Sequence, residues 1–160
     1  MNPGDVRERT VAVPAGGPPV PSDLAALLEQ PVPTRLLDGA YTAFDELTFD
    51  AERGVWRLGT AARGGSIALM SSGEVRCRYP AGDVFVSSTF AKFNETVRAV
   101  AARYPFYDVA SFDDEAHMAR LHEDLFDAVS AVDLRAADEG WWNDLLWEIL
   151  SGDYGVEAFE

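Results

Sequence analysis

Residues 83–93 read DVFVSSTFAKF, and the spacing of apolar residues changes within this stretch. Before Ser88 the apolar side chains fall in short runs, as they do in β-strands. After Ser88 they recur every three or four residues, which is the spacing of one face of an α-helix. The chain therefore changes from strands to helices here, and this order is typical of an α+β fold.

The chain before Ser88 carries short β-like runs separated by turn residues. Within residues 74–79, apolar side chains alternate with charged ones, so one face of this strand is expected to face water. Residues 71–73, Ser-Ser-Gly, form a tight connection of the kind found in antiparallel hairpins. We predict an antiparallel meander of about five to six strands. Five strands are identified, at residues 41–49, 55–58, 66–70, 74–79 and 84–87.

Three helices are predicted after Ser88. Ser87, Ser88 or Thr89 can cap the first helix, and its apolar stripe is expected to pack on the sheet. The stripe consists of Phe90, Phe93, Val97, Val100, Ala101 and Tyr104. The second helix starts in the acid-rich segment 111–115 and runs to about Val132. The third helix spans residues 141–150. The predicted architecture is an antiparallel sheet with helices packed on one face.

The N-terminal region is rich in proline, with seven of the nine prolines in the first 33 residues. Residues 1–21 are expected to form a flexible Pro/Gly-rich leader with little order before Ser22. Ser22 and Asp23 can cap a short helix over residues 24–28. On this division, residues 22–160 form a single domain.

The composition is that of one globular domain. The 160 residues are 48% apolar, which is enough to bury a core. No stretch approaches the roughly 18 apolar residues of a membrane span, and residues 1–17 lack the apolar centre of a signal peptide. The single cysteine, Cys77, cannot form an intramolecular disulfide. We therefore expect a cytoplasmic protein.

The net charge of −14 is distributed unevenly along the chain. Residues 1–106 hold 12 acids and 11 bases, whereas residues 107–160 hold 15 acids and two bases, Arg120 and Arg135. Such a field repels nucleic acid and anionic membranes and favours a basic protein partner. The alternative is that acid-rich helices serve only solubility.

A search for catalytic and metal-binding patterns yields no candidate site. His117 and His122 lie about 140° apart on a helix, so they cannot share a metal as an i, i+4 pair does. His122-Glu123 resembles the start of a zinc motif, but Phe126 stands where the second histidine is needed. Glycine-bearing motifs of hydrolases and nucleotide-binding proteins are absent. We expect no enzyme activity, no metal and no cofactor, and a carboxylate-dependent enzyme is the competing hypothesis.

Two stretches resemble the SUKH superfamily, the α+β immunity proteins of bacterial polymorphic-toxin systems, and within it the fourth SUKH subgroup. Residues 83–93 are similar to the last strand of that family, which leads through a small polar pair into a helix with buried phenylalanine. Residues 139–152 resemble its terminal helix, where tryptophan is followed by leucines, glutamate and glycine. The resemblance covers roughly residues 36–152, with Ser87 where asparagine is common.

This resemblance implies a protein that binds and blocks a cognate toxin, commonly a nuclease or nucleic-acid-modifying enzyme, without chemistry of its own. A regulatory adaptor of the same superfamily is the alternative. Most of the tryptophans are expected in the core, although Trp141 and Trp147 could be interface anchors. The hypothetical toxin contacts are Asp113, Asp114, Glu123, Asp124, Asp127 and Trp141.

Overall fold

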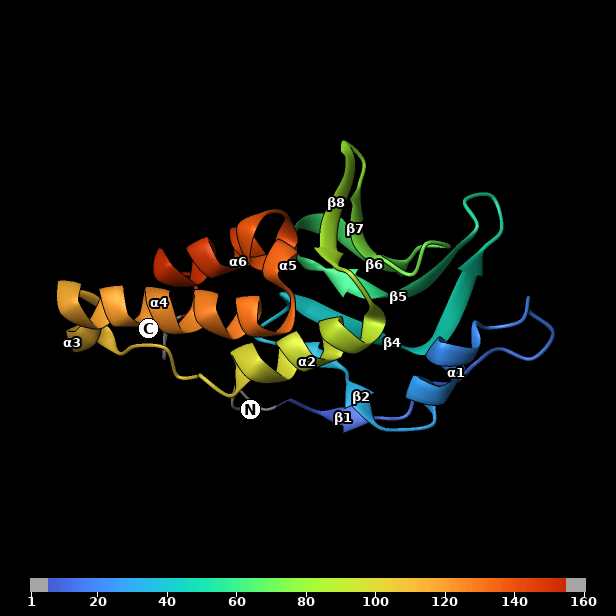
Figure 1. Ribbon diagram of the computed structural model, residues 1–160, viewed down its shortest axis with the longest axis horizontal. Coiled ribbons are helices and arrows are strands. Elements are labelled where there is room, and N and C mark those ends of the chain that lie inside the picture. Colours follow the sequence, from blue (N-terminus) through green and yellow to red (C-terminus); the bar gives the residue numbers. More distant parts are fainter. Residues whose placement is uncertain (1–5, 155–160) are drawn as a thin grey trace.

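The computed structural model describes residues 6–154, and it contains a six-stranded antiparallel sheet beside a group of helices (Figure 1). The strands of this sheet lie in chain order, each hydrogen-bonded to the next. The α+β class and the antiparallel meander are therefore confirmed. The strands are β3 (Arg35–Leu36), β4 (Tyr41–Asp50), β5 (Val55–Ala61), β6 (Gly65–Leu69), β7 (Val75–Tyr79) and β8 (Gly82–Ser87).

The described residues form six α-helices. Three of the helices after Ser88 correspond to those that the sequence predicts. The helices are α1 (Ser22–Leu28), α2 (Phe90–Ala101), α3 (Val109–Phe112), α4 (Glu115–Val132), α5 (Leu134–Asp138) and α6 (Trp141–Leu150). A short 3-10 turn, Ala62–Gly64, joins β5 to β6. α5 is absent from the predicted helices.

α2 begins after Thr89, whose hydroxyl oxygen accepts a hydrogen bond of 3.2 Å from the backbone N–H of Lys92. Its buried stripe packs on the sheet as predicted, since the Phe93 ring lies 5.0 Å from that of Tyr41 on β4. The helix ends at Ala101, so Tyr104 lies in the loop that follows.

The second predicted helix is divided into α3 and α4, because two aspartates each start a helix. Asp108 accepts a hydrogen bond of 2.7 Å from the backbone N–H of Ser111 and caps α3. Asp114 caps α4 by accepting from the N–H groups of Ala116 and His117, at 2.9 and 3.2 Å. A carboxylate at each start satisfies amides that lack a helical partner.

The described part of the expected leader lies against the domain. β1 (Glu8–Arg9) pairs antiparallel with β2 (Val32–Pro33), and the side chain of Val11 is buried. This differs from the expectation of little order before Ser22. A proline is compatible with the edge of a sheet, where its missing N–H leaves no ladder bond unmade.

The start of α1 also differs from the prediction. The helix begins at Ser22 itself, after Pro21, and no side chain caps it. The expected caps, Ser22 and Asp23, are therefore its first two helical residues. Proline holds its own φ near the value that a helix entry needs, so the chain can turn into α1 without a side-chain cap.

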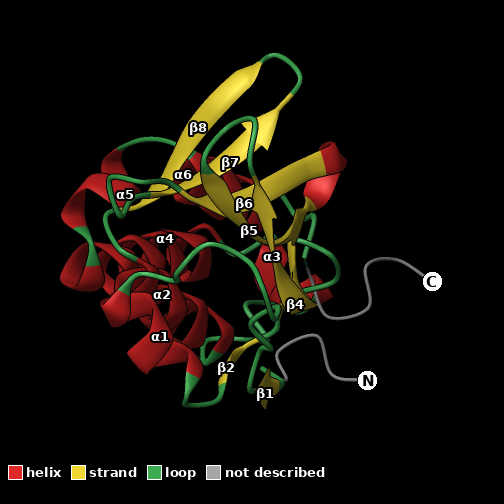
Figure 2. Cartoon of the chain, turned by 90° about the vertical axis from the view of Figure 1, so that its right-hand side faces the viewer, coloured by secondary structure: helices red, strands yellow, loops and turns green. Residues whose placement is uncertain are grey.

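The helices join the sheet along its edge strand, β8. The carboxylate of Asp133, which is 3% exposed, accepts hydrogen bonds from the backbone N–H and the hydroxyl of Ser88, at 2.7 and 3.0 Å. Gly140 has φ +86°, and a Cβ at this position would lie 2.3 Å from the carbonyl oxygen of Phe85. Both contacts fix the helices, which lie together on one side of the sheet (Figure 2).

Candidate interaction surface

α4 is amphipathic, and its solvent-facing side carries carboxylates. Leu121, Leu125 and Val129 are buried, whereas Glu123, Asp124 and Asp127 are exposed. These three carboxylates are spread over about 6 Å of the helix axis, because each residue advances it by about 1.5 Å. The structure therefore brings together three of the predicted contact residues.

The other two predicted aspartates lie at the start of the same helix. Asp113 and Asp114 are exposed in the turn between α3 and α4. They lie roughly 15 Å along the helix axis from Asp124. We refer to Asp113, Asp114, Glu123, Asp124 and Asp127 together as the acidic face.

The carboxylates of the acidic face differ in their partners. Asp124 accepts a charge-assisted hydrogen bond of 2.8 Å from Nε of Arg103, which lies just beyond the end of α2. The carboxylate of Asp114 caps α4. Within the described part of the chain, no ion pair or hydrogen bond engages the side chains of Asp113, Glu123 or Asp127. These three carboxylates remain available to an external partner.

Trp141 is not an exposed anchor. It is 6% exposed, and its ring packs edge to face on that of Trp142 at 4.9 Å. The reason lies in the start of α6, where Gly140 contacts β8 and turns the first residues of the helix toward the sheet. Trp147, the other tryptophan considered as an anchor, is 52% exposed.

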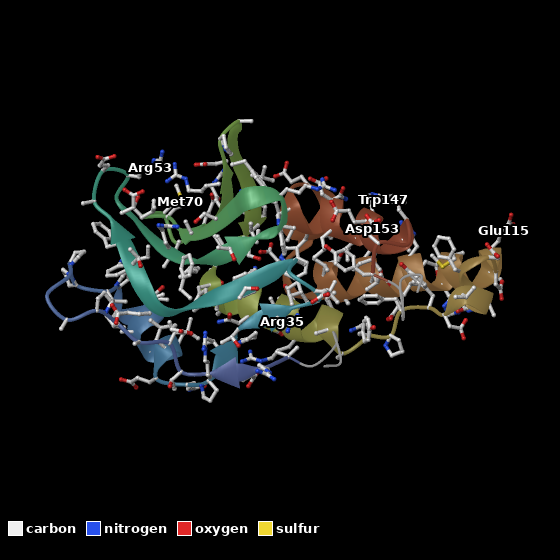
Figure 3. The ribbon with its side chains drawn as sticks, turned by 180° about the vertical axis from the view of Figure 1, so that it is seen from behind. Arg35, Arg53, Met70, Glu115, Trp147 and Asp153 are labelled. Carbon is white, nitrogen blue, oxygen red and sulfur yellow. The ribbon has the colours of Figure 1, made fainter. Side chains whose placement is uncertain are left out.

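Trp147 lies on a shallow groove between α4 and α6, at the helical end of the molecule (Figure 3). Its ring is 5.2 Å from that of His122 and 5.7 Å from that of Phe126. The groove has a volume of about 320 Å³. This α4/α6 groove is lined by Met118, Ala119, His122, Glu123, Trp147 and Leu150.

The sequence predicts the α4 side of this groove but not the α6 side. Met118, His122 and Phe126 follow one another at intervals of four, which places them in one row along α4. The partner of this row on α6 is set by the packing of two helices, and a local pattern does not contain that information.

The solvent-facing side of the sheet carries arginines. A hollow of about 500 Å³ is lined there by residues that include Arg53, Arg57 and Arg78. Arg78 forms an ion pair of 3.0 Å with Asp83, and Arg76 forms one of 3.1 Å with Glu74. This face therefore holds charges of both signs, largely paired with each other.

His117 and Cys77, which lie outside the acidic face, are engaged in or buried by the fold. His117 Nε2 lies 3.1 Å from the carbonyl oxygen of Phe106, and burial raises the pKa of the Cys77 thiol. Among residues 6–154, no group of three or more His, Cys, Asp or Glu side chains is arranged to hold a metal ion. No helix in the same range has the length and apolar character needed to cross a membrane.

Comparison with known proteins identifies a family. No curated protein and no solved structure matches the chain. Residues 4–148 match the family of SUKH-4 immunity proteins, in agreement with the meander and the helical group described above. Such proteins neutralise a cognate toxin and are not enzymes. The chain therefore belongs to the SUKH-4 immunity protein family.

Proposed function

We propose that this immunity protein neutralises a basic toxin, a nuclease or another enzyme that modifies nucleic acid, by covering its phosphate-binding surface with the acidic face. The observation that carries this proposal is the pair Glu123 and Asp127. Both carboxylates are exposed on α4 and have no partner within the described residues.

The segment of the chain that contains this pair is strongly acidic. Residues 107–160 contain 15 acids and two bases. One of the bases, Arg135, is already engaged in ion pairs with Glu74 and Glu139, at 3.0 and 2.6 Å. Arg120 is the only arginine or lysine of α4. A field of one sign steers a partner of the opposite sign and raises the rate of association.

The individual carboxylates have different parts in this proposal. Asp124 is held by Arg103, whose positive charge offsets its own, so it contributes less than Glu123 and Asp127 both to the field and to new contacts. Glu123 and Asp127 can accept hydrogen bonds from arginine or lysine side chains without first breaking an internal bond. Arginine and lysine are also the residues with which a nucleic-acid enzyme holds phosphates. A carboxylate surface can therefore occupy the same side chains and exclude the substrate.

The experiment is a measurement of association kinetics with the cognate toxin domain, made catalytically inactive. The variant E123K/D127K reverses the two unpaired carboxylates. We expect its association rate to fall by roughly tenfold or more at low salt, and the difference to shrink as salt screens the charges.

The matched control is E29K/E52K, which changes the net charge by the same amount. Glu29 and Glu52 are exposed, lie outside α4, and have no ion pair within the described residues. We expect this control to associate at nearly the rate of the wild type. Equal rates for wild type and E123K/D127K would refute the proposed face.

A further inference from the structure

We propose that the α4/α6 groove receives one arginine side chain of the toxin, with its guanidinium on the ring of Trp147 and hydrogen-bonded to the carboxylate of Glu123. This inference rests on the proposed function, because it names the group by which a basic toxin would be anchored.

Trp147 differs from every other tryptophan of the chain. Trp56, Trp141 and Trp142 are 5%, 6% and 0% exposed, whereas Trp147 is 52% exposed. Covering an exposed ring of this size with a binding partner is favourable, because it removes apolar surface from water. Large aromatic side chains are also the residues that most often dominate the affinity of a protein interface.

The ring of Trp147 is held in place before any partner arrives. His122 and Phe126 of α4 contact it at centroid distances of 5.2 and 5.7 Å, and they also contact each other at 4.6 Å. A ring that is already packed on one side loses little conformational freedom when its other side is covered.

The charge at the groove indicates what covers it. Glu123 lines the groove, and its carboxylate has no partner within the described residues. Leu150, which also lines the groove, is the last residue of α6, where the helix dipole places partial negative charge. An apolar occupant would bury the Glu123 carboxylate without a partner, and a second copy of this chain would add like charge. A cation satisfies both the ring and the carboxylate.

The chain itself contains a complete example of this arrangement. The guanidinium carbon of Arg135 lies 3.9 Å from the centroid of the Phe85 ring. The same guanidinium donates hydrogen bonds of 3.0 and 2.6 Å to the carboxylates of Glu74 and Glu139. The α4/α6 groove has the ring and the carboxylate, but no arginine is among the residues that line it. An arginine fits better than a lysine, since its planar guanidinium can stack on a ring while it donates to a carboxylate.

The test is the dissociation rate of the complex with the inactive toxin domain. We expect Trp147→Ala to raise this rate by at least about 30-fold, the size typical of an interface anchor, and to change the association rate little. Trp147→Phe keeps an aromatic face and should recover most of the loss. The matched control is Leu134→Ala, because Leu134 is 66% exposed and lies outside the groove.

A dissociation rate for Trp147→Ala within twofold of the wild type would overturn the inference. If E123K/D127K slows association in the same series, the proposed function stands without the groove. If E123K/D127K associates normally while Trp147→Ala dissociates rapidly, Trp147 anchors the toxin, but the proposed steering by the acidic face fails.

A second measurement tests the arginine directly. We expect N-acetylarginine amide to shift the indole N–H resonance of Trp147 in NMR spectra, and the uncharged N-acetylcitrulline amide to leave it unchanged. Glu123→Gln should weaken the response to the arginine compound. Equal shifts from both compounds, or none from either, would contradict a cation site.

Discussion

The acidic face on α4 and the solvent-facing side of the sheet are both charged, but they differ in how far their charges are paired within the chain. On the sheet, Arg78 is paired with Asp83 and Arg76 with Glu74. On α4, Glu123 and Asp127 have no partner within the described residues. A paired charge is largely satisfied inside its own chain, whereas an unpaired one keeps its field for another molecule. The difference indicates which charged region of this protein is suited to binding.

The largest effect on this comparison is expected from Gly140→Ala, which acts where the helices meet the sheet. The new Cβ would lie 2.3 Å from the backbone oxygen of Phe85, at a residue with φ +86°. We expect the free energy of unfolding to fall by about 3 kcal/mol or more, measured by urea denaturation.

The control for this change is Gly39→Ala. Gly39 has a similar φ of +90°, but nothing lies within 4 Å of the position of its Cβ. Only backbone strain remains, which costs about 1–2 kcal/mol. Equal losses for the two variants would show that the contact with β8 does not hold α6 in place.

The next largest effect is expected from Asp133→Ala, which removes both hydrogen bonds to Ser88. The N–H of the half-buried Ser88 then lacks its acceptor, so we expect a loss of about 2 kcal/mol in the free energy of unfolding. Ser88→Ala removes only the hydroxyl and should cost about 1 kcal/mol. Asp138→Ala is the exposed control, and a loss as large as that of Asp133→Ala would contradict this account.

A smaller effect on stability separates the two charged regions directly. Asp83→Ala breaks an ion pair on the sheet, so we expect it to cost about 0.2–1 kcal/mol in unfolding free energy and to leave toxin binding unchanged. Asp127→Ala breaks no pair, so its stability should match the wild type while its association with toxin slows. Thermal unfolding and binding kinetics are measured on both variants. Slower toxin binding by Asp83→Ala, with normal binding by Asp127→Ala, would contradict this assignment of the two regions.

The smallest effect is expected from alkaline pH on the core between the sheet and α2. Burial raises the pKa of Tyr41, which is 2% exposed, so the folded state favours its protonated form. Stability from this group is present below its unfolded pKa of about 10 and is lost as pH rises. At pH 10 the loss is about 0.4 kcal/mol, and Tyr41→Phe should remove that part of the pH dependence. An unchanged dependence in this variant would contradict the assignment.

Local patterns predict the parts of this fold that local geometry determines. Alternation in residues 74–79 identifies β7, with Val75 and Cys77 fully buried, and the spacing after Ser88 identifies α2. The pairing of β1 with β2 joins segments more than 20 residues apart. The proline-rich composition of the N-terminal region does not reveal this pairing and suggests only a leader. The division of α3 from α4 also escapes a reading of apolar spacing, because two aspartate caps cause it.

The candidate surface could be predicted by residue type but not by partner. The five predicted acids all lie exposed along α4 or at its start, as their charge leads one to expect. That Asp124 is engaged by Arg103 depends on the packing of α4 against the end of α2. That Trp141 is buried while Trp147 is exposed depends on how Gly140 sets α6 against β8. Both are contacts between segments that one sequence does not place.

The central claim is that the unpaired carboxylates of α4 neutralise a toxin, and growth rescue tests it most directly. The cognate toxin domain is expressed in a sensitive host with wild type, E123K/D127K or E29K/E52K, all at equal soluble levels. We predict rescue by the wild type and by E29K/E52K, and loss of rescue with E123K/D127K. Full rescue by E123K/D127K would contradict the account.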